Sequence, residues 1–221
     1  MNIIIANSNP IHNKTFEELE ITNKSLIYKK DDLNEEKIRA INPQYIFFPH
    51  WSFLIPENIF HNFTCIVFHM TDLPYGRGGS PLQNLIERGH ESTKISAIKV
   101  VKEIDAGPIY LKKDLTLYGT AEEIFIRAGK IISEMIIEII NKSIKPSPQK
   151  GEPLFFKRRK PEMSNIHKID TIEKVYDYIR MLDAEGYPKA FIENEYFRFE
   201  FSRATLKSDN SIIADVRIFK K

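Results

Sequence analysis

The chain has 221 residues, of which 42% are hydrophobic and 28% charged, and lysine plus arginine exceed aspartate plus glutamate by 32 − 30 = 2. This composition is that of a folded globular protein and excludes a disordered chain, and the small net charge does not point to a polyanion as partner. The length allows one domain with a small appendage, or two small domains.

The single cysteine, Cys65, cannot form a disulfide within the chain, as is typical of a protein from a reducing compartment. Residues 1–7 lack the basic region and the long apolar core of a signal peptide. No apolar run reaches the ~18 residues that a membrane-spanning helix needs. We therefore expect a cytoplasmic protein with no membrane partner.

The first predicted element is a strand. Residues 2–6 read Asn-Ile-Ile-Ile-Ala, a run that predicts a central parallel strand buried on both faces. Residues 7–10 predict a turn and contain none of the glycines of a dinucleotide-binding loop. Residues 16–27 are ambiguous, and residues 29–39 predict a polar helix with Leu33 and Ile38 facing inward.

A second buried strand is predicted at residues 45–48, and it leads into a segment that contains His50 and Trp51. His50 follows the end of this strand. Trp51 is the only tryptophan, and a lone tryptophan is more often part of the core than a platform for a ligand. The other histidines occur in polar or loop contexts, where we expect surface residues: His12, His61, His90 and His167.

A third strand is predicted at residues 65–68, and His69 arrives where that strand should stop. The loop that follows carries a hydroxyl, a carboxylate, a guanidinium and three glycines before Ser80-Pro81 predicts the start of a helix ending near Gly89. A histidine at a strand end is often only structural. Ligands of open α/β sheets, however, bind outside the carboxyl ends of the strands, and so polar a loop favours a binding site at His69.

The remaining elements alternate between strands and helices. A mixed strand at residues 95–102 leads to Asp105, and residues 108–117 predict an extended segment. Thr120 is expected to cap a long helix that runs to about Asn141 with an apolar stripe facing the core. A linker at 143–153, a last helix at 170–183 and three short strands at 191–197, 199–205 and 212–219 complete the chain.

The stretch from His69 to Gly78, His-Met-Thr-Asp-Leu-Pro-Tyr-Gly-Arg-Gly, resembles the His-x-Ser-x-Leu-Pro-x-x-Arg-Gly signature of formyltetrahydrofolate-dependent formyltransferases, with Thr71 in the place of serine. Residues 103–109 resemble the Asp-x-Gly segment that carries the catalytic aspartate of that family. The resemblance extends over residues 44–191 and includes segments 155–162 and 179–188, which are similar to those of sugar-modifying members.

This resemblance implies an α/β fold, with a Rossmann-like core whose mostly parallel sheet is flanked by helices, and a small C-terminal β-rich appendage. Residues 1–150 would form the formyltransferase catalytic core. Residues 151–221 would form a linker, a helix and a small C-terminal β subdomain. The formyl donor would be formyltetrahydrofolate, and no metal is required.

The resemblance also assigns roles at the site. His69 would stabilise the oxyanion and act as acid or base, while Asp105 would orient the His69 ring and receive a proton. The two residues are 105 − 69 = 36 positions apart, which fits the ends of two different strands that meet at one edge of the sheet. The pterin ring would lie against Trp51, Ser52, Phe53, Leu54, Ile104 and Asp105. Substrate contacts would come from Thr71, Asp72, Arg77 and Gly78.

One position departs from the family pattern. Val67 stands where an asparagine is expected two residues before the histidine, so one oxyanion donor is missing. His50 is the first candidate to replace that asparagine as a catalytic residue. A catalytically silent protein that binds folate or a nucleotide sugar is the alternative interpretation.

The similarity to sugar-modifying members favours, as acceptor, the amine of a nucleotide-linked dideoxy amino sugar, such as a UDP-4-amino-4,6-dideoxy-N-acetyl hexosamine for surface glycans. Methionyl-tRNA formyltransferase is the main rival, but the net charge of +2 and the short C-terminal part argue against it. The segment after Gly151 argues against a glycinamide ribonucleotide formyltransferase. We therefore expect a nucleotide-linked amino sugar as partner and no nucleic acid, and a homodimer is a further option.

The four cations at 157–160 would form a solvated surface or meet a diphosphate or the folate glutamate tail.

Overall fold

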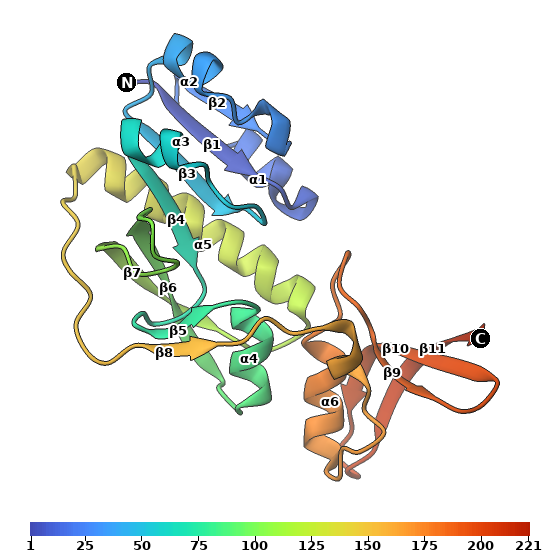
Figure 1. Ribbon diagram of the computed structural model, residues 1–221. Helices are drawn as coiled ribbons and strands as arrows, with labels where there is room; N and C mark the ends of the chain where they lie inside the picture. The colour runs from blue at the N-terminus through green and yellow to red at the C-terminus, as the bar shows by residue number, and fades with distance from the viewer. The chain divides into compact units, whose positions relative to one another are not determined.

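The computed structural model describes all 221 residues, and its contacts divide the chain into two units (Figure 1). Unit 1 comprises Met1–Gly78, Thr93–Leu115 and Ile126–Phe155. Unit 2 comprises Gly79–Ser92, Thr116–Phe125 and Phe156–Lys221. The domain boundary expected at residue 150 stays a prediction.

Unit 1 is built on a six-stranded sheet in the order β2-β1-β3-β4-β6-β7. Its strands are β1 (Ile3–Asn7), β2 (Lys24–Ile27), β3 (Tyr45–His50), β4 (Cys65–His69), β6 (Ser92–Lys99) and β7 (Ile109–Thr116). The pairs β1–β2, β1–β3 and β3–β4 are parallel, whereas β4–β6 is antiparallel. The expected mostly parallel sheet of an α/β fold is confirmed. A separate two-stranded sheet joins β5 (Tyr75–Gly78) to β8 (Leu154–Phe156).

The sheet is buried on both faces. Ile4 and Ala6 of β1 pack in a cluster with residues of α2 (Glu35–Ile41) and α3 (Glu57–Asn62). Ile3 and Ile5 alternate with them along β1 and are fully buried as well, so the opposite face is also covered. The long helix α5 (Ala121–Lys142) runs along the sheet there (Figure 1). This explains why residues 2–6 carry no polar side chain after Asn2.

The helix expected at residues 29–39 is wrong in its extent. A 3₁₀ turn, η2 (Lys30–Asp32), precedes Asn34, and α2 covers only Glu35–Ile41. The Asn34 side chain accepts hydrogen bonds from the backbone of Glu36 and Lys37, which fixes the helix start. The inward-facing Leu33 and Ile38 are buried as predicted. The ambiguous segment resolves into α1 (Asn13–Glu17), which follows η1 (Pro10–His12), and β2.

The two predicted helix caps differ in outcome. The Thr120 hydroxyl accepts from the Glu123 backbone N–H at 3.3 Å, and the Glu123 carboxylate accepts from the Thr120 N–H at 2.8 Å, which makes the expected capping box of α5. Ser80 precedes α4 (Pro81–Glu87), but its side chain does not cap that helix. Its hydroxyl accepts instead from the Arg159 backbone N–H at 3.1 Å, and so serves the following segment of unit 2.

Unit 2 contains a three-stranded antiparallel sheet in the order β11-β10-β9, with α6 packed on β10. Its elements besides α4 are η3 (Pro161–Ser164), α6 (Ile172–Arg180), β9 (Ala190–Glu193), β10 (Phe197–Leu206) and β11 (Ile212–Lys220). The three strands confirm the expected C-terminal β-rich appendage, although β9 ends before the turn at Asn194. None of the helices combines the length and the apolar character needed to cross a membrane.

The cations at 157–160 do not form one continuous block. The Arg159 side chain is only 6% exposed, and it donates to the Glu87 carboxylate and to the Met163 carbonyl, each at 2.6 Å. Lys157, Arg158 and Lys160 are exposed. The run therefore has three surface cations, and the Arg159–Glu87 ion pair holds the backbone between them.

Candidate functional site

His69 lies at the carboxyl end of β4, where its side chain is 8% exposed. Its Nε2 is 2.7 Å from the carbonyl oxygen of Gly76, which lies in β5. A carbonyl oxygen can only accept a hydrogen bond, so Nε2 carries the proton. The signature loop thereby fixes both the orientation of the ring and its tautomer.

Asp105 lies in the loop between β6 and β7, and the structure brings it to His69. The Asp105 Oδ2 atom accepts a hydrogen bond from the Gly78 N–H at 2.9 Å and lies 3.6 Å from His69 Nδ1. The second distance is too long for a hydrogen bond. The expected convergence of these two residues, 36 positions apart, is therefore present, but not as two strand ends at one edge: β6 is antiparallel to β4, and the loop after β6 brings Asp105 to His69. Their catalytic roles stay a prediction.

The backbone that carries Asp105 is unusual. Asp105 has φ +54°, in the left-handed region that aspartate tolerates better than most residues. Gly107 follows it against β6, where a Cβ atom would lie 1.7 Å from the Lys99 carbonyl oxygen. Only glycine permits this close backbone approach. The Asp-x-Gly pattern thus has a direct steric reason.

This pair can move a proton. With Nε2–H held by Gly76, Nδ1 is the ring atom that gains or loses a proton. When Nδ1 is protonated, the ring carries a positive charge that the Asp105 carboxylate stabilises. His69 can therefore act as an acid or a base at the Asp105 side of the ring.

Val67 occupies the position where an asparagine is expected, and its side chain is apolar. It packs against the apolar cluster that includes Phe48 and Cys65, which Trp51 also contacts. Its backbone pairs with Phe48 and Ile98 in the sheet. Its side chain offers no hydrogen-bond donor to an oxyanion.

The structure does not support the idea that His50 replaces that asparagine. A register shift between β1 and β3 pairs His50 with Asn7, and the His50 ring lies 5.4 Å from the ring of His12, centroid to centroid. His12 in turn packs against Gly129 of α5. Asn7 continues the alternation of Ile3 and Ile5, so His50 points to the face that α5 covers, whereas Val67 packs on the face of α2 and α3.

His12 was expected at the surface, and that expectation is wrong. The side chain is 2% exposed, and its Nδ1 atom has no hydrogen-bond partner. Burial, and secondarily the charge of His50, lowers the pKa of His12 to about 3. Burial also lowers the pKa of His50 to about 4. Both rings are therefore neutral near neutral pH.

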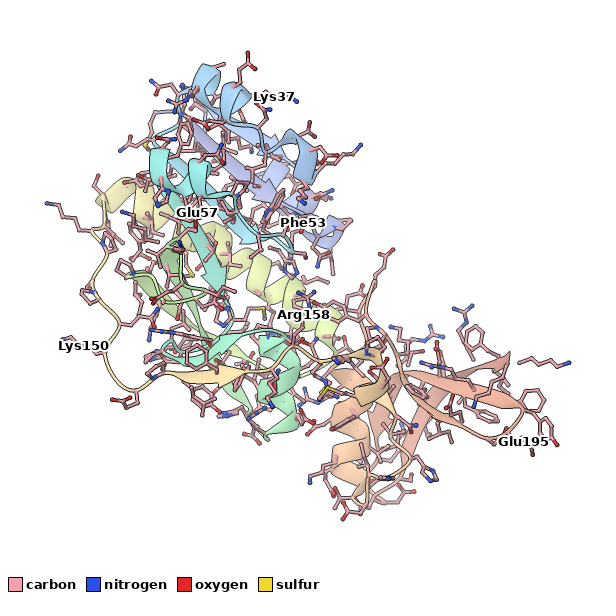
Figure 2. All side chains as sticks on the ribbon, in the orientation of Figure 1. Lys37, Phe53, Glu57, Lys150, Arg158 and Glu195 are labelled. Carbon is pink, nitrogen blue, oxygen red and sulfur yellow. The ribbon has the colours of Figure 1, made fainter.

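The residues expected at the pterin pocket include three exposed apolar side chains, and the pocket itself stays a prediction. Trp51 contacts Phe53 edge to face, and its buried Nε1–H has no hydrogen-bond partner in the protein. Three large apolar side chains in the loops after β3 and β6 are exposed, namely Phe53 (labelled in Figure 2), Leu54 and Ile104. The Ser52 N–H already donates to the Ser8 hydroxyl at 3.0 Å. A flat pterin ring could stack on the exposed apolar groups.

Two expected substrate residues are engaged within the protein. Thr71 is fully buried, and its hydroxyl donates to the Gly76 carbonyl at 3.4 Å. Asp72 pairs with Lys112 and, at 3.4 Å, with Lys94. Partial burial acts to raise the pKa of Asp72, but the two lysines outweigh it and lower that pKa. Both residues thus stabilise the signature loop, and contact with substrate stays a prediction for them.

Arg77 and Gly78 lead to a residue that the sequence reasoning missed. Gly78 donates to Asp105, as described, while the Arg77 guanidinium donates to Gln149 Oε1 from Nη2 at 2.8 Å and from Nε at 3.2 Å. Gln149 Nε2 donates to the carbonyl oxygens of Asp105 and Gly107, each at 2.8 Å. Gln149 lies in the segment 143–153, whose composition indicated only a linker.

Comparison with known proteins identifies the family. The model described as formyl transferase matches residues 4–139, more than half of the chain. This chain belongs to the formyl transferase family. A second model, described as the C-terminal domain of methionyl-tRNA formyltransferase, matches residues 161–219. The expected enzyme family and the fold of its formyltransferase core are confirmed. Formyltetrahydrofolate as the donor stays a prediction.

Individual relatives agree with this assignment. A solved structure named methionyl-tRNA formyltransferase from Clostridium thermocellum is 57% identical, covers 100% of both chains and has a TM-score of 0.96. The methionyl-tRNA formyltransferase of Thermodesulfovibrio yellowstonii is 27% identical over 159 residues, which are 68% of this chain and 52% of that protein. This chain thus spans about half the length of that curated relative. HypX from Aquifex aeolicus, solved with tetrahydrofolic acid, shares the fold at 18% identity, with a TM-score of 0.79 over 94% of this chain and 38% of that one.

These relatives overturn the expected acceptor. The nucleotide-linked amino sugar and the exclusion of nucleic acid were wrong, because the 57% identical protein and the curated relative are both named for methionyl-tRNA. Four residues of the segments that suggested a sugar have buried side chains: Phe156, Arg159, Met181 and Leu182. Packing is sufficient to explain these four residues, so they do not identify the acceptor. The homodimer stays a prediction.

Proposed function

We propose that this formyl transferase moves the formyl group of formyltetrahydrofolate to the amine of methionyl-tRNA. The observation that carries the proposal is the 57% identity to a protein of that name over the whole of both chains. The match of residues 161–219 to the C-terminal domain of methionyl-tRNA formyltransferases supports the same acceptor. Because tRNA and reduced folates are present together in the cytoplasm, we place the protein there.

In the balanced step, the amine nitrogen bonds to the formyl carbon, the bond from that carbon to the folate nitrogen breaks, and one proton passes from the amine to the folate nitrogen. The folate supplies only the formyl group. His69 Nδ1, which faces Asp105, is placed to donate a hydrogen bond to the oxygen that becomes negatively charged and to transfer the proton. Asp105 holds the charged ring in place.

Incubation of the purified chain with formyltetrahydrofolate and methionyl-tRNA tests this proposal. Mass spectrometry of the aminoacyl ester should show the gain of one formyl group, with free methionine as the comparison acceptor. Formylation that needs the tRNA supports the proposal. No mass gain on methionyl-tRNA, with folate binding intact, overturns it.

The role of Asp105 is tested by Asp105→Asn, which keeps the shape of the side chain but removes its charge. We expect the rate of formyl transfer to fall by about 10²-fold or more, a size common for groups that take part in proton transfer. Asp114→Asn is the matched control, because Asp114 is exposed on β7 of the same unit. A rate for Asp105→Asn equal to that of the control would contradict the assignment.

A further inference from the structure

Gln149 makes four hydrogen bonds from a segment that otherwise lies at the surface. Its neighbours Pro148 and Lys150 are exposed, and Lys150 is labelled on this segment in Figure 2. The Gln149 side chain turns inward instead and is half-buried. Both N–H groups of its amide donate, and its oxygen accepts twice. An amide has no further hydrogen-bonding capacity, so every group of this side chain is used.

The identity of each partner fixes the orientation of the amide. The two partners of Nε2 are carbonyl oxygens, which can only accept. The partner of Oε1 is the Arg77 guanidinium, which can only donate. A flipped amide would place donor against donor and acceptor against acceptor. The site is therefore specific for an uncharged amide of this length.

These contacts close a ring of interactions around the proposed catalytic aspartate. Gln149 holds the backbone of Asp105, and it also holds Arg77. The residue after Arg77, Gly78, donates its N–H to the Asp105 carboxylate. The backbone and the carboxylate of Asp105 are thus both held, one directly by Gln149 and the other through the loop that Gln149 fixes.

We propose that Gln149 is a positioning residue for formyl transfer, which holds the Asp105 carboxylate beside His69. Asp105 has a left-handed backbone, and its carboxylate lies 3.6 Å from His69 Nδ1 without a hydrogen bond to it. Such an arrangement depends on outside support, because little in the pair itself holds it. Displacement of a catalytic group by about 1 Å can cost about 10²-fold in rate. This inference rests on the proposed function.

The test compares Gln149→Leu with Gln149→Glu. Leucine removes all four hydrogen bonds at similar volume. Glutamate keeps the acceptor for Arg77 but turns an oxygen toward the carbonyls of Asp105 and Gly107. Gln44→Leu is the matched control, because Gln44 is an exposed glutamine of unit 1. All variants are first compared with the wild type for thermal stability.

We expect kcat to fall by about 10-fold to 10²-fold in both Gln149 variants, with KM for methionyl-tRNA and for the folate changed less than about threefold, because Gln149 acts through Asp105 in the transition state. The pH profile of kcat should change in shape, since the proton-transferring pair is disturbed. An unchanged kcat and pH profile in Gln149→Leu overturns the proposal.

A second readout separates this proposal from the proposed function. The amide proton of Gly78 reports its hydrogen bond to Asp105, and the nitrogens of the His69 ring report the approach of the carboxylate. In NMR spectra, Gln149→Leu should shift both sets of signals and speed the exchange of the Gly78 amide, while Gln44→Leu leaves them unchanged. If the wild type proves inactive on methionyl-tRNA, signals that stay at their wild-type positions in Gln149→Leu still overturn the positioning role.

Discussion

At the scale of single residues, the proposed catalytic pair could be predicted from the sequence, whereas the residue that supports it could not. His69 and Asp105 were predictable from the family signature, whereas the strand-end argument fails for them, because β6, which precedes Asp105, runs antiparallel to β4. Gln149 was not predictable, because its partners Arg77 and Asp105 are 72 and 44 residues away and no local pattern marks the contact. His12 was wrongly predicted to lie at the surface for a similar reason, since its polar neighbours in the sequence do not indicate that α5 packs against it.

The most informative single change concerns Val67. Val67→Asn restores the amide that the family carries two residues before the histidine, and one added oxyanion donor should raise the rate of formyl transfer by about tenfold or more. The same change places an amide against an apolar cluster, so the free energy of unfolding should fall by about 1–3 kcal/mol. Single-turnover rates and urea unfolding measure the two effects. A slower Val67→Asn enzyme would show that the site has replaced the missing donor by other means.

At the scale of elements, tertiary packing determines the structure where the local sequence pattern does not predict it. The apolar stripe of α5 and the run in β1 were predicted from periodicity and burial, and both are confirmed. The segment 29–39 has helix-forming residues but no continuous apolar stripe, and only its last turns are helical. No sequence pattern predicted the contact of η1 with α5, although that contact depends on one small residue, Gly129.

Gly129 tests that contact. A Cβ atom at this position would lie 2.6 Å from His12 Nδ1, which is part of a rigid and buried ring. Gly129→Ala should therefore destabilise the protein by about 1–3 kcal/mol through overpacking, although alanine favours a helix by roughly 1 kcal/mol. In a His12→Ala background the clash disappears, and the same change should become stabilising. Chemical denaturation of the four proteins of this cycle gives the coupling, and additive effects would show that the ring does not limit Gly129.

The two buried imidazoles also predict acid sensitivity. The pKa values of His12 and His50, about 3 and about 4, lie below the ordinary value of 6.5, so the unfolded chain binds protons first as the pH falls. Stability from the neutral rings is fully present above pH ~6.5, and it declines by roughly 1.4 kcal/mol per pH unit for each histidine as the pH falls toward those values.

Replacing His12 by glutamine removes one of these titrations. The free energy of unfolding of His12→Gln, measured from about pH 4 to about pH 7, should depend less steeply on pH than that of the wild type. His61→Gln is the control, because His61 is exposed on α3. An equal slope in all three proteins would mean that His12 is not held neutral by its burial.

At the scale of the whole molecule, the fold class followed from the sequence, but the acceptor did not. Alternating strands and helices predicted the α/β core, and the three terminal strands predicted the β appendage. The net charge of +2 was a poor guide to the acceptor, because a sum over 221 residues hides a local group of cations. Lys157, Arg158 and Lys160 form such a group in unit 2, next to the buried Arg159.

These three exposed cations predict a salt-dependent interaction with tRNA phosphates, if methionyl-tRNA is the acceptor. Replacing all three by alanine should raise KM for methionyl-tRNA while kcat at saturation stays near that of the wild type. The slope of log affinity against log salt should become shallower by about 0.7–0.9 for each phosphate that the variant no longer neutralises. Arg159 is kept, because its removal would leave the half-buried Glu87 without the cation that it pairs with. Lys29→Ala combined with Lys30→Ala, two exposed changes in unit 1, is the control. An unchanged KM and salt slope in the triple variant would place the tRNA-binding surface elsewhere.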